Sequence, residues 1–271
     1  MAFGLRPDDD APNLDYGGYL KLTELLGLQQ PIADPGHHDE HLFIVIHQVY
    51  ELWFKQLLHE IDAVVDLLEA EDPLEAARLL RRCIEIMRVL IAQITVLETM
   101  TPNDFLAFRD HLRPASGFQS AQFRALEFRC GVRDPGHLHH FEHEELLHAM
   151  LKRRLEQPTL GEALWSLMRW RGFDAPAGEK QAAHDRRVRA LVQVYEDARS
   201  HRDLHQLAEA MIEFDEMVTA WRLRHVAMAE RMIGAKVGTG GSEGVGYLRS
   251  TTRHRFFPEL WEVRSHLGES G

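Results

Sequence analysis

Residues 41–56 read HLFIVIHQVYELWFKQ, and this stretch decides the fold class of the chain. It belongs to a predicted helix over residues 39–71, in which large apolar side chains recur every three or four positions. Side chains with that spacing share one face of a helix. A single imidazole interrupts this face, which consists of Phe43, His47, Tyr50, Phe54, Leu58, Ile61, Val65 and Leu68.

A second apolar stripe with one histidine runs along a predicted helix over residues 203–233. It consists of Leu204, Leu207, Met211, Phe214, Val218, Trp221, His225, Met228 and Met232. An imidazole on such a face loses hydration energy unless it finds a partner. His47 and His225 are therefore either core histidines bonded to a carbonyl or an acid, or ligands in an apolar pocket. Haem suits the second alternative, because its macrocycle needs an apolar pocket and its iron an imidazole.

Helical spacing dominates the rest of the chain, and no alternating strand pattern interrupts it. Prolines and glycines divide it into further predicted helices over residues 15–28, 74–100, 103–111, 118–129, 140–156, 160–169, 181–199 and 259–266. Several of these helices are much longer than average, which is typical of a bundle. No linker is long or polar enough to separate two domains. We therefore expect one all-α domain over residues 1–271, a bundle whose long helices enclose a haem pocket.

Composition narrows the classes of function. The chain has 271 residues and a formal net charge of −11, which argues against a broad surface for nucleic acid or an anionic membrane. Its two cysteines, Cys83 and Cys130, cannot build a disulfide framework, so we expect a cytoplasmic location. The N-terminus shows no signal-peptide pattern, and the longest uncharged apolar stretch, residues 89–97, is too short to cross a bilayer.

A carboxylate-bridged di-iron bundle is the competing metal interpretation. It requires a Glu-x-x-His spacing on two helices, and the sequence offers this spacing once, at Glu145 and His148. The histidine-dense runs at residues 37–41 and 137–145 are typical of solvated helix faces. In the first run, Asp39 is expected to cap the helix that follows.

Two features suit a small polar group on a ligand. Phe105 and Arg109 lie four residues apart, so they share a face of a short predicted helix. Arg109 could bind a carboxylate through two parallel hydrogen bonds, or pair with a neighbouring aspartate. Residues 234–246 contain six glycines directly after the helix of His225. They could form either an adaptable cover over a ligand or a surface loop.

Residues 41–56 resemble the haem-distal helix of the tryptophan 2,3-dioxygenase family. Other segments resemble that family in the same order along the chain. They are YGGYL at residues 16–20, PASGFQSAQFR at 114–124, WRLRH at 221–225, GTGGS at 238–242 and YLRST at 247–251. The resemblance covers residues 15–255, nearly the whole chain.

The resemblance implies a homotetramer with one haem b per subunit that converts L-tryptophan and O2 into N-formyl-L-kynurenine. Both oxygen atoms enter across the indole C2–C3 bond, at the first step of the kynurenine pathway. In the family, the N-terminal segment of one subunit reaches the active site of its neighbour. We therefore expect residues 1–38 to contact another copy of the chain, and we expect no nucleic-acid or membrane partner.

The site residues follow from the resemblance, position by position. His225 matches the axial ligand of the haem iron, and Gly238 is expected to bind the cofactor. His47 matches the distal histidine, which hydrogen-bonds the indole N–H and is the expected catalytic residue. Arg109 matches the residue that binds the substrate carboxylate. Other substrate contacts are expected from Phe43, Ile44, Val45, Ile46, Phe105, Thr239 and, on the partner subunit, Tyr16, Tyr19 and Leu20.

Some of these roles are more specific. Phe43 is expected to pack on the indole ring, and Thr239 to contact the ammonium or carboxylate group. Phe105 stands where some bacterial relatives have tyrosine, so polar recognition depends more on Arg109. Whether His47 also transfers a proton stays open. Two other functions fit the same stripes, a haem carrier or gas sensor and a metal-free scaffold, but neither needs a site that recognises an amino acid.

Overall fold

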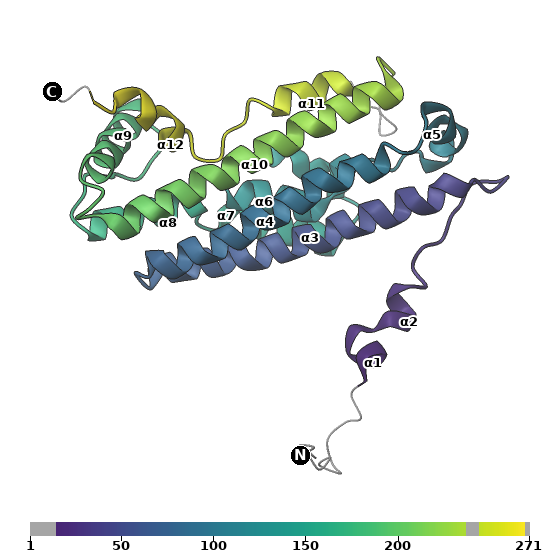
Figure 1. Ribbon diagram of the computed structural model, residues 1–271, viewed down its shortest axis with the longest axis horizontal. Coiled ribbons are helices and arrows are strands. Elements are labelled where there is room, and N and C mark those ends of the chain that lie inside the picture. Colours follow the sequence, from purple (N-terminus) through teal and green to yellow (C-terminus); the bar gives the residue numbers. More distant parts are fainter. Residues whose placement is uncertain (1–14, 237–243, 269–271) are drawn as a thin grey trace, which may run out of the picture.

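The computed structural model describes residues 15–236 and 244–268 of the chain (Figure 1). All regular elements in these two ranges are helices, which confirms the predicted all-α fold. The long helices are α3 (His38–Glu69), α4 (Pro73–Leu97) and α10 (Arg202–Ile233). The shorter elements are α1 (Tyr16–Leu20), α2 (Leu22–Leu25), α5 (Pro102–Arg109), η1 (Asp110–Leu112), η2 (Gly117–Gln119), α6 (Ala121–Arg129), η3 (Pro135–Phe141), α7 (Glu145–Glu156), α8 (Leu160–Trp170), α9 (Gln181–Glu196), α11 (Val245–Thr251), α12 (Pro258–Glu262) and η4 (Val263–His266).

The three long helices form the centre of the bundle. α4 packs against both α3 and α10, and the three lie side by side in Figure 1. Leu57 and Ile61 on α3, Leu80 on α4 and Leu207 on α10 are completely buried in one common core. Each such side chain contributes about 1.5–3 kcal/mol through its burial. This core holds the two histidine-bearing helices at fixed positions.

A tight turn joins α3 to α4. Glu71 adopts a positive φ of 63°, and Asp72 caps α4 by accepting a hydrogen bond from the backbone N–H of Glu75 at 3.1 Å. Pro73 follows at the start of α4, where its missing N–H costs no helical hydrogen bond. The turn brings the two helices together, and the Tyr50 hydroxyl donates to the Leu90 carbonyl across their interface at 2.8 Å.

The structure differs from the predicted helices in several places, most clearly in the following ones. Residues 15–28 form two short helices, because Lys21 between them adopts a left-handed backbone with a φ of 54°. α7 begins at Glu145 and not at residue 140, because the preceding residues form η3. His37, not Asp39, caps α3 through a ring nitrogen that accepts the Asp39 N–H. α11 is a helix that the sequence did not predict.

The N-terminal segment with α1 and α2 extends away from the bundle (Figure 1). No residue of these two helices is buried, and Tyr16 and Tyr19 are 76% and 69% exposed. The Glu40 carboxylate holds the end of this segment, since it accepts the backbone N–H groups of Ile32 and Ala33 at 2.7 and 3.0 Å. The expected contact of this segment with another copy stays a prediction, as does the single domain.

Within the described ranges, no helix is both long enough and apolar enough to cross a membrane.

Candidate functional site

A cavity of about 300 Å³ lies where α3, α5, α6, α10 and α11 meet. This volume is at the lower end of the range for small-molecule sites. Side chains that are apolar or aromatic form much of its wall: Tyr50, Phe54, Leu97, Phe105, Phe118, Phe123, Trp221, Val226, Met228, Ile233 and Leu248. Polar and charged side chains form the rest of the wall, so the cavity suits a largely apolar ligand that also carries polar groups.

His47 lines the cavity from α3. Its Nδ1–H donates to the Phe43 carbonyl at 2.7 Å, so Nε2 of the neutral ring carries a free lone pair. Burial lowers the pKa of His47, and the Phe43 carbonyl and the charge of Glu51 oppose this shift. Although His47 has accessible surface, that surface faces the cavity, and protein atoms surround the rest of the ring. The imidazole therefore loses hydration in spite of its accessible surface. His47 is therefore an uncharged hydrogen-bond acceptor at neutral pH.

His225 lines the same cavity from α10. Burial, together with a smaller effect of the nearby His47, lowers its pKa to about 4. The Trp221 ring stacks parallel to the imidazole, with 5.6 Å between ring centroids and an interplanar angle of 7°. Within the described part of the chain, no residue forms a hydrogen bond with the His225 ring. An uncharged imidazole with a free lone pair in an apolar cavity is suited to bind a metal ion.

Arg109 brings a positive charge to the cavity wall. It is the last residue of α5, a helix that Thr101 begins with a reciprocal capping box to Asp104. One turn earlier, the Phe105 ring also lines the cavity and stacks on Phe43 at 5.7 Å between centroids. The structure therefore brings together Arg109, Phe105, Phe43 and His47, as the sequence predicts.

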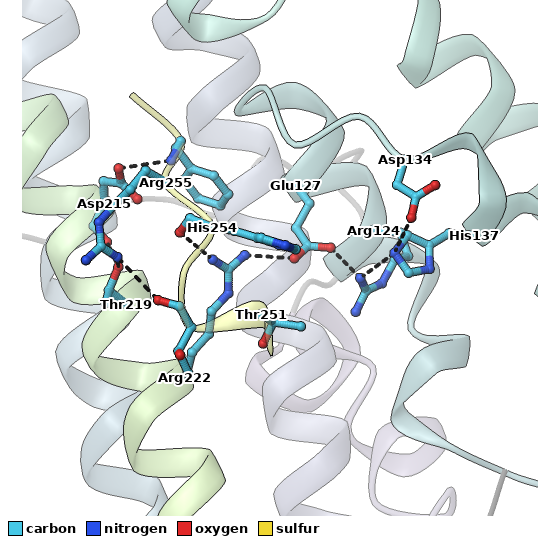
Figure 2. A network of polar contacts seen from close by, with 12 residues as sticks. Arg124, Glu127, Asp134, His137, Asp215, Thr219, Arg222, Thr251, His254 and Arg255 are labelled. Atoms are coloured by element: carbon cyan, nitrogen blue, oxygen red, sulfur yellow. Dashed lines mark hydrogen bonds and ion pairs between the residues drawn. The ribbon is translucent and has the colours of Figure 1, made fainter. Parts of the chain in front are cut away.

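A buried ion network forms another part of the wall, and the sequence analysis assigned no role to its members. Glu127 on α6 accepts hydrogen bonds from Arg124 at 2.5 Å and from Arg222 at 2.8 Å (Figure 2). All three residues line the cavity and are at most 6% exposed. The sequence could have pointed to this network, because Arg124 and Arg222 lie in the two segments, 114–124 and 221–225, that resemble the family.

Phe43 does not itself line the described cavity, and three further expected substrate contacts on α3 do not reach it either. Ile44, Val45 and Ile46 precede His47, and each residue of a helix turns its side chain by about 100°. Ile46 is buried in the core, where its carbonyl accepts a hydrogen bond from Gln93 at 3.0 Å. Contact of these three residues with a substrate stays a prediction.

The remaining expected site residues lie away from the cavity or outside the description. Tyr16, Tyr19 and Leu20 belong to the exposed N-terminal segment. Gly238 and Thr239 lie outside the described residues. These assignments stay predictions as well.

The di-iron interpretation finds no support in the described ranges. Neither Glu145 nor His148 lines the cavity. Across residues 15–236 and 244–268, no three histidine, cysteine, aspartate or glutamate side chains lie together in a way that could hold a metal ion. A metal ion bound in the cavity would therefore need a cofactor that provides most of its ligand atoms.

The lowered pKa of His225 predicts how the stability of the ligand-free protein depends on pH. The unfolded imidazole titrates near 6.5 and the folded one near 4, so protons bind preferentially to the unfolded chain in this window. The free energy of unfolding should be fully retained above pH 6.5 and fall as the pH drops toward 4. Urea unfolding of the wild type and of His225→Leu at several pH values measures this loss, which should be smaller in the variant. A His59→Leu control on the exposed face of α3 should keep the wild-type pH dependence, whereas an equal loss in all three proteins would contradict the prediction.

Comparisons with known proteins place this chain in a family. The profile of the family described as tryptophan 2,3-dioxygenase matches residues 6–176 and 142–267. The chain is 48% identical over 270 residues to the tryptophan 2,3-dioxygenase of Nocardioides sp., covering 96% of this chain and 97% of that protein. It is 44% identical over 261 residues to that of Herpetosiphon aurantiacus, and 42% identical over 265 residues to that of Caulobacter vibrioides. These two alignments cover 94% and 95% of this chain and 98% and 100% of the relatives. The chain belongs to the tryptophan 2,3-dioxygenase family.

Proposed function

We propose that the cavity binds one haem b per subunit, that the His225 imidazole would hold its iron, and that L-tryptophan binds beside His47. As a member of its family, the chain is an oxidoreductase that converts L-tryptophan to N-formyl-L-kynurenine. Both atoms of O2 enter across the indole C2–C3 bond. The observation that carries the proposed site is the pair of uncharged imidazoles, on two different helices, that face one apolar cavity.

The donor set of the cavity fits haem. A porphyrin supplies four of the iron ligands, so the protein needs to contribute one imidazole, and His225 has no competing hydrogen bond within the described residues. The aromatic wall suits the macrocycle, and Arg124 and Arg222 supply positive charge for its carboxylates. Glu127 accepts from both arginines, so two guanidinium groups face one carboxylate and the cluster keeps a net positive charge beside the cavity. When bound, haem supplies the O2 chemistry.

His47 would orient the substrate. Its Nδ1–H is used by the Phe43 carbonyl, so Nε2 can only accept a hydrogen bond, and the indole N–H is a donor. The Phe105 ring lines the cavity and offers an apolar surface for the indole, and Phe43 supports it by packing on both Phe105 and His47. Fixing the indole in this way lowers the entropic cost of reaching the reactive geometry. The same hydrogen bond could also carry a proton, and the proposal leaves that role open.

Arg109 would bind the other end of the substrate. Its guanidinium lines the cavity next to Phe105, at a place where little solvent reaches it. A charge-assisted hydrogen bond to a carboxylate contributes about 1.5–3 kcal/mol. Thr239 would add a contact to the ammonium or carboxylate group. The substrate is then held at its indole by His47 and at its carboxylate by Arg109.

The proposal includes a homotetramer in the cytoplasm, acting at the first step of the kynurenine pathway. The exposed tyrosines of α1 support the assembly, because apolar side chains on an extended segment gain stability when another surface covers them. Tyr16, Tyr19 and Leu20 would then complete the substrate pocket of a neighbouring copy. Both cysteines are free and buried, in agreement with a reducing compartment.

The direct test is aerobic turnover of L-tryptophan by haem-reconstituted, reduced protein. The near-ultraviolet absorbance of formylkynurenine should rise, and the rise should require both haem and O2. A histidine-ligated haem spectrum without product would indicate a haem carrier or sensor instead. Failure to take up haem would overturn the proposed site and leave His47 and His225 as structural residues.

The two histidines should differ in what their loss does. His225→Ala removes the iron ligand, so the variant should lose the histidine-ligated ferrous spectrum. His47→Ala should retain that spectrum but turn over about tenfold more slowly, as expected for one lost hydrogen bond. Absorbance spectra and steady-state kinetics of both variants measure these effects. A His225→Ala protein with normal haem and activity would contradict the assignment of the axial ligand.

Arg109→Ala should raise the KM for L-tryptophan by about 10- to 100-fold, because one charge-assisted contact is lost. The haem spectrum should be unchanged. Arg113→Ala is the matched control, since Arg113 lies one turn further along, is exposed and pairs with Asp110 at 3.2 Å. Equal KM values for the two variants would remove Arg109 from the substrate site.

A further inference from the structure

Glu127 is a carboxylate enclosed between two guanidinium groups. One of its oxygens accepts from Arg124 at 2.5 Å, and the other accepts from Arg222 at 2.8 Å (Figure 2). The three side chains are 3–8% exposed, and all of them belong to residues that line the cavity. A single carboxylate of α6 therefore fixes two arginines that come from different helices.

The two arginines extend the network in opposite directions. Arg222 also donates to the backbone carbonyl of His254 at 3.1 Å, in the segment between α11 and α12. Arg124 also contacts a ring nitrogen of His137 on η3 at 3.2 Å. Figure 2 shows Glu127 between these two branches. Through this one side chain, α6 is connected to η3, to α10 and to the segment that follows α11.

The charges of this cluster do not cancel. Two guanidinium groups face one carboxylate, and burial makes an uncompensated positive charge costly. The pKa of His137 is lowered by burial and by Arg124, so this neighbour adds little positive charge at neutral pH. The Nε atoms of Arg124 and Arg222 are buried and have no hydrogen-bond partner among the described residues. Because the three residues also line the cavity, their net positive charge suits an anionic group of a ligand on the cavity side.

Arg222 also ties this cluster to the proposed iron ligand. It precedes His225 by three residues on α10, so the two side chains lie on neighbouring positions of one helix face. Any change in the position or charge of Arg222 thus changes the electrostatic potential close to His225. α10 therefore carries one arginine of the cluster together with the imidazole, while Arg124 and Glu127 lie on α6.

We propose that Glu127 is a positioning residue, which aims Arg124 and Arg222 at the carboxylates of the bound haem and sets the charge near its iron. This inference rests on the proposed function. Without the Glu127 charge, both arginines lose their common anchor, and the positive charge next to the haem increases. Two properties should change together, the retention of haem and the reduction potential of its iron.

The test compares Glu127→Gln with the wild type and with Glu259→Gln. Glu259 is a matched control, because it is 5% exposed, accepts from the buried Arg187 at 2.7 Å and does not line the cavity. Transfer of haem to apomyoglobin measures retention, and spectroelectrochemical titration measures the potential. Glu127→Gln should release haem about 10- to 100-fold faster than the wild type. Its midpoint potential should become more positive, since added positive charge favours the reduced iron.

The outcomes separate this inference from the function on which it rests. If the wild type takes up no haem, both fail. If the wild type binds haem but Glu127→Gln matches Glu259→Gln in haem release and in potential, Glu127 is a merely structural partner and the inference alone is overturned.

A second variant covers the case in which Glu127→Gln does not fold. Glu127→Asp keeps the charge but shortens the side chain, so it should release haem faster at an unchanged potential. Wild-type haem release in Glu127→Asp would overturn the positioning role.

Discussion

The whole site depends on two imidazoles, those of His47 and His225, that remain uncharged in the wall of the cavity. Desolvation does this, because a cation in the apolar bundle would lose its hydration without compensation. Burial is the largest cause of the lowered pKa of both His47 and His225. The long helices make this burial possible, because the core between α3, α4 and α10 fixes the two helices that carry the rings. The Phe43 carbonyl then selects which nitrogen of His47 keeps its proton.

Another part of the cavity wall keeps its charges. There, Glu127 is shared between Arg124 and Arg222, so two guanidinium groups face one carboxylate. An apolar macrocycle with acidic substituents needs both kinds of wall, one without charges around its centre and one with positive charges at its edge. Since α10 carries Arg222 and His225 within one turn, a single helix contributes to both walls.

Periodicity within one helix made part of this site predictable from the sequence. His47 and His225 stand out because each interrupts an apolar stripe, and Phe105 and Arg109 because four residues separate them. The Glu127 cluster was not predictable in this way, since Arg222 lies 95 residues further along the chain and only the tertiary fold brings the two together. Local backbone choices also escaped prediction. The left-handed conformation of Lys21 and the 3₁₀ segment before α7 break runs whose side-chain spacing is helical.

The parallel stack of Trp221 on His225 has an optical consequence. An indole emits light in the near ultraviolet, where a porphyrin absorbs strongly, and energy transfer is almost complete over a few ångströms. If the cavity binds haem as proposed, the emission of Trp221 should therefore be quenched in a subunit that contains haem and restored in one that does not. Because Trp221 lies one helical turn from His225, this emission would report whether haem occupies the site of the proposed iron ligand.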